Sequence, residues 1–368
     1  MLRCLLAATL SCASSLLAQN CFNGDFGTLL GQATVDTVFP MQPIGFAFPF
    51  GGTTYSDIHV NDHGFVELSN AGVPTPLTSG SVALYTPVVS NFATGAPKIA
   101  PLYCDMECTG GGEVWIRSSA SECVVTWWNV QSYGFPTPRF TFQLVLEPSG
   151  SIRFVYGPGV TNNSTWGGTS DNGICGVTPA GGVTLPAIVD LSAGGASTNN
   201  STYENWATAI TFDLANNTLL LLPTSPGYAY LTLGAGASCA TASNYGTGCD
   251  SLLLSSIGLP SLGRTNYTLR VNNVLSSPLA LVGFGTAVIN PGTPLAAIGM
   301  SGCFAYTDLG IGLFTAGPVV GASSDLVFGI PNNPAVAGLT FSTQALALSP
   351  TTALGLASSN GTQFTVGF

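Results

Sequence analysis

Two acidic residues, Asp105 and Glu107, have the residue type and spacing that acid–base catalysis or metal binding could use. They precede the turn Gly110–Gly112, and Glu113 follows it. Residues i and i+2 of a strand point to the same face, so the two carboxylates are expected side by side. Paired carboxylates can hydrolyse glycosidic bonds at separations of about 5 to 9.5 Å, and they can hold Ca²⁺ in extracellular loops. A solvated strand edge is the favoured interpretation, calcium binding by Asp105 and Glu107 is second, and hydrolysis is last.

The chain has only two histidines, His59 and His63, on either side of the predicted turn Asn61–Gly64. A Ser/His/acid triad needs one of them as its base, and no Gly-x-Ser-x-Gly motif accompanies them. Asp57 and Asp62 add metal-ligand spacing, but that spacing shares one face only on a helix, and this segment is typical of a hairpin. We therefore expect these histidines to bond locally or to be exposed, and we expect no catalytic residue and no enzyme activity.

Tryptophans offer the best ligand-binding candidates. Trp127 and Trp128 are adjacent on a predicted strand, so one should be buried and the other should point outward. Together with Trp115, an outward tryptophan could stack on a sugar ring or on a protein partner. Core packing is the favoured interpretation, and Trp115 and Trp128 are kept as the ligand-binding prediction.

The N-terminus is typical of an exported protein. Residues 1–18 combine one positive charge with a short apolar stretch that ends in Ala18, which predicts a secretory signal peptide. An even number of cysteines on an exported chain indicates disulfides, although their pairing does not follow from the sequence. The cysteines predicted to be oxidised are Cys21, Cys104, Cys108, Cys123, Cys175, Cys239, Cys249 and Cys303. For Cys104 and Cys108, export favours disulfides over zinc.

The charge balance excludes one class of partner. With 7 basic against 17 acidic residues the formal charge is −10, and Lys98 is the only lysine. Such a chain is not suited to follow a phosphate backbone, so no nucleic-acid partner is expected. The apolar run Leu219–Leu222 is interrupted by Pro223 and Pro226, far short of the length of a membrane span, so no transmembrane segment is expected after removal of the signal.

Short runs of alternating residues predict antiparallel strands. Phe140, Phe142, Leu144 and Leu146 alternate with polar residues, and so do Ile152, Phe154 and Tyr156, and later Tyr267, Leu269 and Val271. Long helical periodicity is absent, and Gly, Pro, Asn or Asp separates the runs about every ten residues. The sequence predicts an all-β protein with two antiparallel, sandwich-like domains.

The segment Pro223–Gly227, rich in Pro, Ser and Gly, is the predicted boundary. It divides the chain into a first domain over 19–222, a linker over 223–227 and a second domain over 228–368. Net negative charge is concentrated before this boundary, which also favours two units.

The first domain resembles the extracellular NIDO domain of nidogen-type and mucin-type proteins. The resemblance covers roughly residues 95–157, and an entry hairpin precedes it. Its motifs are Ile99–Asp105, Gly110–Val114, Val124–Val130 and Phe142–Leu146, with the hairpin running from Phe48–Gly52 through Val60–Phe65. This resemblance implies a β fold and an extracellular location, and it gives little information about function. The Cys104 to Cys108 spacing is not part of the family pattern.

The second domain looks like the C-terminal β-domains of secreted planctomycete proteins. The carrying motifs are Tyr245–Cys249, Pro260–Gly263, Gly302–Cys303 and Ala337–Phe341. The resemblance implies a bridge between Cys249 and Cys303, which leaves Cys239 for another partner, and it implies no activity.

Together these features predict a secreted or cell-surface binding and structural protein, similar to an adhesin, without catalytic activity. Its expected partner is an extracellular protein or a glycan. Two alternatives remain: a carbohydrate-binding or carbohydrate-active protein, and a calcium-stabilised adhesin; beyond that Ca²⁺, no cofactor is expected.

Overall fold

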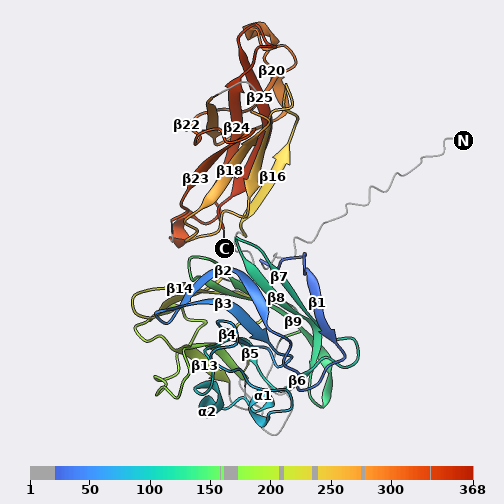
Figure 1. Cartoon of the computed structure of the whole chain (residues 1–368), viewed down its shortest axis with the longest axis vertical. Helices are drawn as coiled ribbons and strands as arrows, with labels where there is room; N and C mark the ends of the chain where they lie inside the picture. The colour runs from blue at the N-terminus through green and yellow to red at the C-terminus, as the bar shows by residue number, and fades with distance from the viewer. Residues whose placement is uncertain are drawn as a thin grey trace, which may run out of the picture.

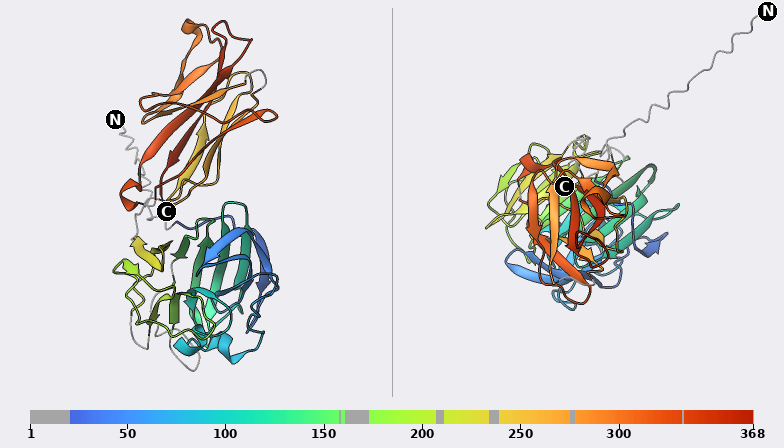
Figure 2. Two further views of the ribbon diagram at one scale, coloured as in Figure 1. Left: turned by 60° about the vertical axis from the view of Figure 1, so that its left-hand side comes forward. Right: turned by 90° about the horizontal axis from the view of Figure 1, so that it is seen from above.

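The computed structural model describes residues 21–157, 159–160, 173–206, 211–233, 239–274, 278–331 and 333–367. Two β domains follow one another along the long axis of the molecule (Figure 1). The same division is visible when the molecule is turned (Figure 2). Antiparallel sheets dominate the described chain, so the predicted all-β, sandwich-like class is confirmed. The predicted signal peptide over residues 1–18 lies outside these ranges.

The larger sheet of the first domain has nine strands in the described part of the chain, in the order β1-β7-β8-β9-β10-β14-β15-β12, with β6 paired to β8. The strands are β1 (Thr28–Gln32), β6 (Met106–Glu107), β7 (Glu113–Ser118), β8 (Cys123–Ser132), β9 (Phe135–Leu146), β10 (Ile152–Tyr156), β12 (Gly195–Ser197), β14 (Thr218–Pro223) and β15 (Tyr228–Leu233).

The facing sheet has six strands among the residues described, in the order β13-β11-β5-β4-β3-β2. These are β2 (Gln42–Phe50), β3 (Thr53–Val60), β4 (Val66–Ser69), β5 (Lys98–Tyr103), β11 (Gly173–Thr178) and β13 (Thr202–Trp206), and two short helices, α1 (Val82–Tyr85) and α2 (Val89–Phe92), lie between β4 and β5. The predicted entry hairpin is β2 and β3, which pair through the turn at Gly51 and Gly52.

Alternating apolar residues build the core between these two sheets, as predicted. Phe142 and Leu144 of β9, and Phe154 of β10, are fully buried in one cluster with Trp127. The outer face of β9 departs from the simple pattern, because Gln143 is also fully buried. Its side chain accepts a hydrogen bond from the Asn23 backbone N–H and donates one to the Asn23 carbonyl. The chain before β1 therefore covers the outer face of the sheet.

The predicted linker over 223–227 is wrong. Strand β15 pairs with β14 from Thr218↔Leu233 to Pro223↔Tyr228, and the Thr224 N–H donates to the Gly227 carbonyl. The segment is thus a tight hairpin inside the larger sheet, and the second domain begins after Leu233 rather than at 228. Proline and glycine are typical of a linker between domains and also of a hairpin turn. The sequence alone does not say whether the strand that follows pairs with the same sheet.

In the part described, the second domain contains sheets of five, three and two strands, in the orders β16-β25-β24-β19-β22, β17-β18-β23 and β20-β21. The strands are β16 (Thr241–Tyr245), β17 (Leu253–Ile257), β18 (Tyr267–Asn272), β19 (Ala280–Gly285), β20 (Val288–Pro294), β21 (Phe304–Thr307), β22 (Gly312–Thr315), β23 (Ser323–Phe328), β24 (Thr340–Leu348) and β25 (Leu356–Thr365), with 3₁₀ turns at Ala296–Ile298 and Pro334–Val336. The predicted alternation of β18 is confirmed, because Tyr267, Leu269 and Val271 are all buried in its core.

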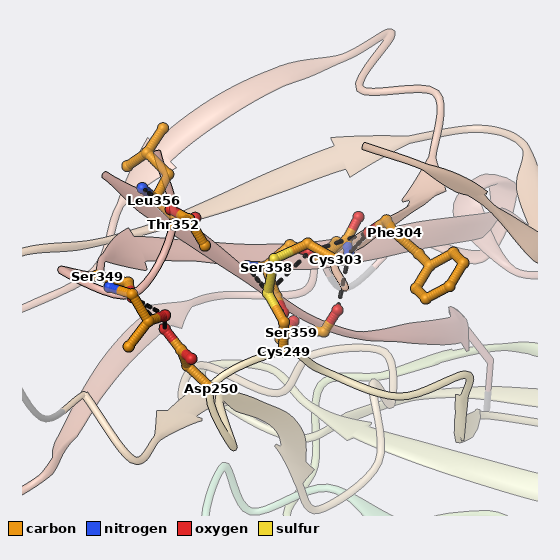
Figure 3. The surroundings of a disulfide bond; sticks show 11 residues. Cys249, Asp250, Cys303, Phe304, Ser349, Thr352, Leu356, Ser358 and Ser359 are labelled. Carbon is orange, nitrogen blue, oxygen red and sulfur yellow. Dashed lines mark hydrogen bonds between the residues drawn. A yellow bond between two sulfur atoms is a disulfide. The ribbon is translucent and has the colours of Figure 1, made fainter. Parts of the chain in front are cut away.

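Disulfides join Cys21 to Cys239, with Cα atoms 5.1 Å apart, and Cys249 to Cys303, with Cα atoms 5.0 Å apart. The second is the bridge that the family resemblance implied. Around it, the Ser358 N–H lies 3.1 Å from Cys249 Sγ and the Ser358 hydroxyl donates to the Phe304 carbonyl (Figure 3).

The other four cysteines are thiols, so their predicted oxidation is wrong. Cys104, Cys108, Cys123 and Cys175 are fully buried in the first domain. Each fills a place in the apolar core, and burial raises the pKa of the Cys108 and Cys123 thiols to about 12. Cys175 also donates a hydrogen bond from its thiol to the Pro101 carbonyl, with the two atoms 2.5 Å apart. A buried thiol behaves as a small apolar residue, which a cysteine count cannot distinguish from half of a bridge.

None of the described helices is long and apolar enough to cross a membrane.

Candidate functional site

An aromatic platform lies on the outer face of the larger sheet of the first domain. Adjacent strands pair Glu113 with Trp128 and Trp115 with Thr126, so Trp115 and Trp128 share one face. Trp127 points the other way and is fully buried, whereas Trp128 is 39% exposed. The prediction that one of the two adjacent tryptophans is core and the other outward is confirmed.

The chain before β1 completes this platform. The Phe26 ring lies 5.2 Å from Trp128 and 6.2 Å from Trp115, and Phe22 lies 6.0 Å from Phe26. The Trp115 indole N–H donates to Glu113 Oε2 at 2.9 Å, which fixes its ring. We define the aromatic platform as Phe22, Phe26, Trp115 and Trp128.

The two acidic residues that were predicted to act together have different hydrogen-bonding surroundings, although burial and, to a lesser extent, the charge of Glu107 raise the pKa of Asp105. Glu107 lies in β6, and its Oε1 atom accepts a hydrogen bond from Gln131 Nε2 at 2.5 Å. Asp105 comes just before β6 and is 8% exposed, with its carboxylate near His63. Calcium binding by Asp105 and Glu107 stays a prediction.

His63 is the centre of a buried polar cluster in the first domain. Its Nδ1 atom accepts the Met106 backbone N–H at 3.0 Å, so the ring proton resides on Nε2. Nε2 lies 3.1 Å from Asp36 Oδ1 and 3.5 Å from Asp62 Oδ1. Burial lowers the pKa of His63 to about 4, so the ring is neutral at physiological pH. Of the two alternatives expected for the histidines, His63 is not exposed, and its ring instead forms hydrogen bonds within the fold.

The turn before His63 explains this placement. The Asn61 side chain accepts the His63 N–H at 2.9 Å, and the Asn61 carbonyl accepts the Trp127 indole N–H at 2.8 Å. Gly64 follows with φ +79°, and a Cβ atom there would lie 2.0 Å from the Leu102 carbonyl oxygen. Only glycine fits this turn, which drives His63 inward rather than toward solvent.

The carboxyl groups around His63 lack a positively charged partner among the described residues. Burial raises the pKa of Asp62 to about 6 and that of Asp105 to about 7. The Asp62 Oδ2 atom is buried without a hydrogen-bond partner. Among the residues described, no lysine or arginine forms an ion pair with Asp36, Asp62 or Asp105.

A cavity of about 550 Å³ opens next to this cluster. We call it the acidic cavity, because the carboxylates of Asp36 and Asp105 line it. Three aromatic residues also line it, Tyr85 at the end of α1 and Tyr133 and Phe135 at the β8–β9 turn, and Val35, Met106 and Gly134 complete the wall. The rim is open, with Tyr133 55% and Phe135 39% exposed. The acidic composition of the segment around Asp105 was visible in the sequence, whereas Asp36 and Tyr133 are too distant in sequence to be grouped by spacing.

A second acidic group lies elsewhere in the first domain. Asp190, Glu204 and Asp213 bring one carboxylate oxygen each within 4.8 Å of one another. These oxygens already accept hydrogen bonds: Asp190 from the Ser192 and Ala193 N–H groups, Glu204 from the Leu191 N–H, and Asp213 from the Ser192 hydroxyl. The arrangement orders a loop, and nothing in the sequence spacing pointed to it.

The metal idea for the two histidines gains no support from the geometry. Asp57 contacts the Ser56 hydroxyl at 2.5 Å and the Ala71 N–H at 3.3 Å, and His59 stands on β3 opposite Glu67. His63 uses both ring nitrogens within the buried cluster. These side chains therefore serve separate local contacts.

Comparison with known proteins agrees with the architecture of the first domain. No solved structure shows significant similarity to the chain. A family model described as NIDO related matches residues 20–219, which is more than half of the 368 residues. The match spans the sandwich from the segment before β1 to β14, including Trp115, Trp128 and the His63 cluster. This chain belongs to the NIDO-related family.

Proposed function

We propose that this protein is an extracellular, non-catalytic binding protein similar to an adhesin. The NIDO-related domain contacts a partner through the aromatic platform, and the second domain acts as a spacer or attachment unit. Membership of the NIDO-related family and two disulfides support an extracellular location.

The observation that carries the proposal is the exposure of Trp128 on the outer face of the larger sheet. Large aromatic side chains dominate the energetics of protein interfaces because they bury much apolar area with little loss of conformational freedom. Trp128 pairs with Glu113 of β7, lies where the pairing of β8 with β9 shifts register, and packs against Phe26, so its ring already has a packing partner before any ligand arrives. Preordering lowers the entropic cost of binding.

The acid–base inventory of the first domain supports a role without catalysis. A general base must reach its substrate, and His63 is fully buried and neutral within its cluster. Burial likewise raises the pKa of the Cys108 and Cys123 thiols, which makes them poor nucleophiles.

Proximity labelling on intact producing cells tests this function. A promiscuous biotin ligase would be fused to the C-terminus of the full chain, as wild type, Trp128→Ala and Val320→Ala. Val320 is the matched control, because it is 76% exposed in the second domain. We expect wild type and Val320→Ala to label the same extracellular proteins and Trp128→Ala to lose them. Unchanged labelling by Trp128→Ala would refute a role for the platform.

A glycan is the second candidate partner, because tryptophan rings also stack on sugar rings. A glycan array with wild type and Trp128→Ala separates the two classes. A signal that disappears in Trp128→Ala supports carbohydrate binding, and silence on every glycan removes that candidate.

The calcium-stabilised adhesin remains a third candidate, motivated by Asp105 and Glu107. It requires a melting temperature that rises with CaCl₂ and falls with chelator. No change in either direction dismisses it.

A further inference from the structure

The acidic cavity has features that the proposed function does not use. Asp105 is 8% exposed, it lines the cavity, and within the described chain its carboxylate accepts no hydrogen bond. His63 Nδ1 lies 3.8 Å from Asp105 Oδ1. That nitrogen presents a lone pair already engaged by the Met106 N–H, so it offers Asp105 no proton. Burying such a group is unfavourable unless something pairs with it.

The basic side chains in the described chain are committed elsewhere. Lys98 pairs with Glu67, Arg153 with Glu122 and Glu147, and Arg270 with Asp325. Arg117 pairs with Glu122, and two further guanidinium groups donate to backbone carbonyls, Arg139 to Thr109 and Asn129 and Arg264 to Leu259. These contacts leave no lysine or arginine of the described residues paired with Asp36 or Asp105, so a cation from a partner would meet two carboxyl groups that lack a counterion.

The wall of the acidic cavity selects the kind of cation. Ca²⁺ takes about six to eight oxygen ligands, but three of the lining side chains are the aromatic rings of Tyr85, Tyr133 and Phe135. Aromatic faces attract organic cations, arginine and lysine above all. The exposed rim, which includes Val35 at 46% exposure, offers apolar surface around the opening. Such a rim excludes water around an inserted side chain when two protein surfaces meet.

We propose that the acidic cavity receives an arginine or lysine side chain of a protein partner. The charged end pairs with Asp36 and Asp105, and its stem lies against Tyr133 and Phe135. This site is separate from the aromatic platform, since it lies beside His63 and the β8–β9 turn rather than on the outer face of β7 and β8.

Peptide titration of the full chain tests the proposal. The probes are two acetylated heptapeptides of Gly and Ser with one central residue, either arginine or its neutral isostere citrulline. Backbone amide chemical shifts of the ¹⁵N-labelled protein report binding. We expect the arginine peptide to shift the signals of Asp36, Asp105 and Gly134, and the citrulline peptide to leave them in place. Equal shifts with both peptides, or none with either, overturn the proposal.

Variants on the exposed rim separate recognition from folding. Tyr133→Leu removes the aromatic face, and we expect it to weaken arginine-peptide binding about three- to fivefold. Tyr133→Phe keeps the ring and should bind within about twofold of wild type. Asp36→Asn can still accept the His63 hydrogen bond but lacks the charge, so it should lose binding while Asp25→Asn, at an exposed site, keeps it. Equal binding by Tyr133→Leu and Tyr133→Phe would count against the cavity as the site.

Two further arms identify a wrong occupant or a wrong surface. Addition of CaCl₂ alone should leave the amide shifts of Asp36 and Asp105 unchanged. Shift changes that reach a plateau as CaCl₂ is added would show a metal site instead and overturn the proposal. Trp128→Ala should bind the arginine peptide like wild type, so failure of the aromatic platform and failure of the acidic cavity give different results.

Discussion

Leu221 and Leu222 are neighbours in β14, yet they belong to the cores of different domains. Leu221 is fully buried in the sandwich of the first domain, and Leu222, 6% exposed, packs with the core of the second. Leu219 and Leu220 divide in the same way. Residues 219–222 do not alternate with polar residues because both faces of β14 are buried, one in each core. The second domain follows the first along the long axis of the molecule (Figure 2), and the outward side chains of β14 join its core.

Buried ion pairs also lie at this junction. Arg153 Nη2 lies 3.2 Å from Glu147 Oε1 and 3.5 Å from Glu122 Oε2, and Glu147 interacts with Arg264 of the second domain. Replacing one member leaves buried charge unpaired, so we expect Arg153→Met to lower the free energy of unfolding by about 3–5 kcal/mol. Urea denaturation measures this loss.

Arg270→Met is the matched control for that variant. Arg270 pairs with Asp325 at 2.7 Å, but the two side chains are 43% and 34% exposed. Exposed pairs contribute little because water screens them, so its loss should be much smaller. Equal losses in the two variants would mean that the junction charges are not buried in solution.

The oxidation state of the cysteines gives a second prediction. Thiol titration with Ellman's reagent, without reductant and on protein lacking residues 1–18, should find four thiols after denaturation, from Cys104, Cys108, Cys123 and Cys175. The native protein should react with almost none, because these side chains are buried. Finding no thiols after denaturation would restore the prediction of four disulfides.

The two adjacent tryptophans should respond oppositely to truncation. Trp127 is stacked 5.0 Å from Phe142, so Trp127→Ala should cost about 3–5 kcal/mol of stability. Trp128→Ala should change stability by less than about 1 kcal/mol, because the ring is at the surface. Chemical denaturation of both variants checks this, and a large loss in Trp128→Ala would make Trp128 a packing residue rather than a contact residue.

Buried carboxyls predict an unusual dependence of stability on pH. Burial raises the pKa of Asp62 to about 6 and those of Asp105 and Glu204 to about 7. The folded state then holds protons that the unfolded state releases, so these groups add stability as pH falls from about 7 toward 4. His63 opposes them, since its lowered pKa makes the unfolded state the better proton acceptor between about 6.5 and 4.

As pH falls, the three carboxyls together add more stability than His63 removes. We therefore expect the melting temperature to be at least about 2 °C higher near pH 5 than near pH 7.5. Calorimetry across this range gives the profile. Asp105→Asn should flatten it, because the amide does not titrate. A melting temperature that falls steadily from pH 7.5 to 5 would contradict the assignment of buried, protonatable carboxyls.

Local sequence patterns predicted what depends on neighbours in the chain. The alternation of Phe142 with Gln143, the hairpin at Gly51 and the opposite orientations of Trp127 and Trp128 all follow from strand geometry. The pairing of β15 with β14, the burial of His63 and the meeting of Asp36 with Tyr133 depend on contacts between distant segments. Such contacts have no signature in one sequence, which is also why Cys104 and Cys175 could not be distinguished from disulfide cysteines.

A photo-crosslinking residue, p-benzoylphenylalanine, placed at position 128 tests the proposed binding surface most directly. The same residue at position 320 of the second domain serves as the reference. Irradiation of the protein on its producing cells should yield a discrete crosslinked product from position 128 and none from position 320. Crosslinking from position 320 alone would place the partner on the second domain and contradict binding through the aromatic platform.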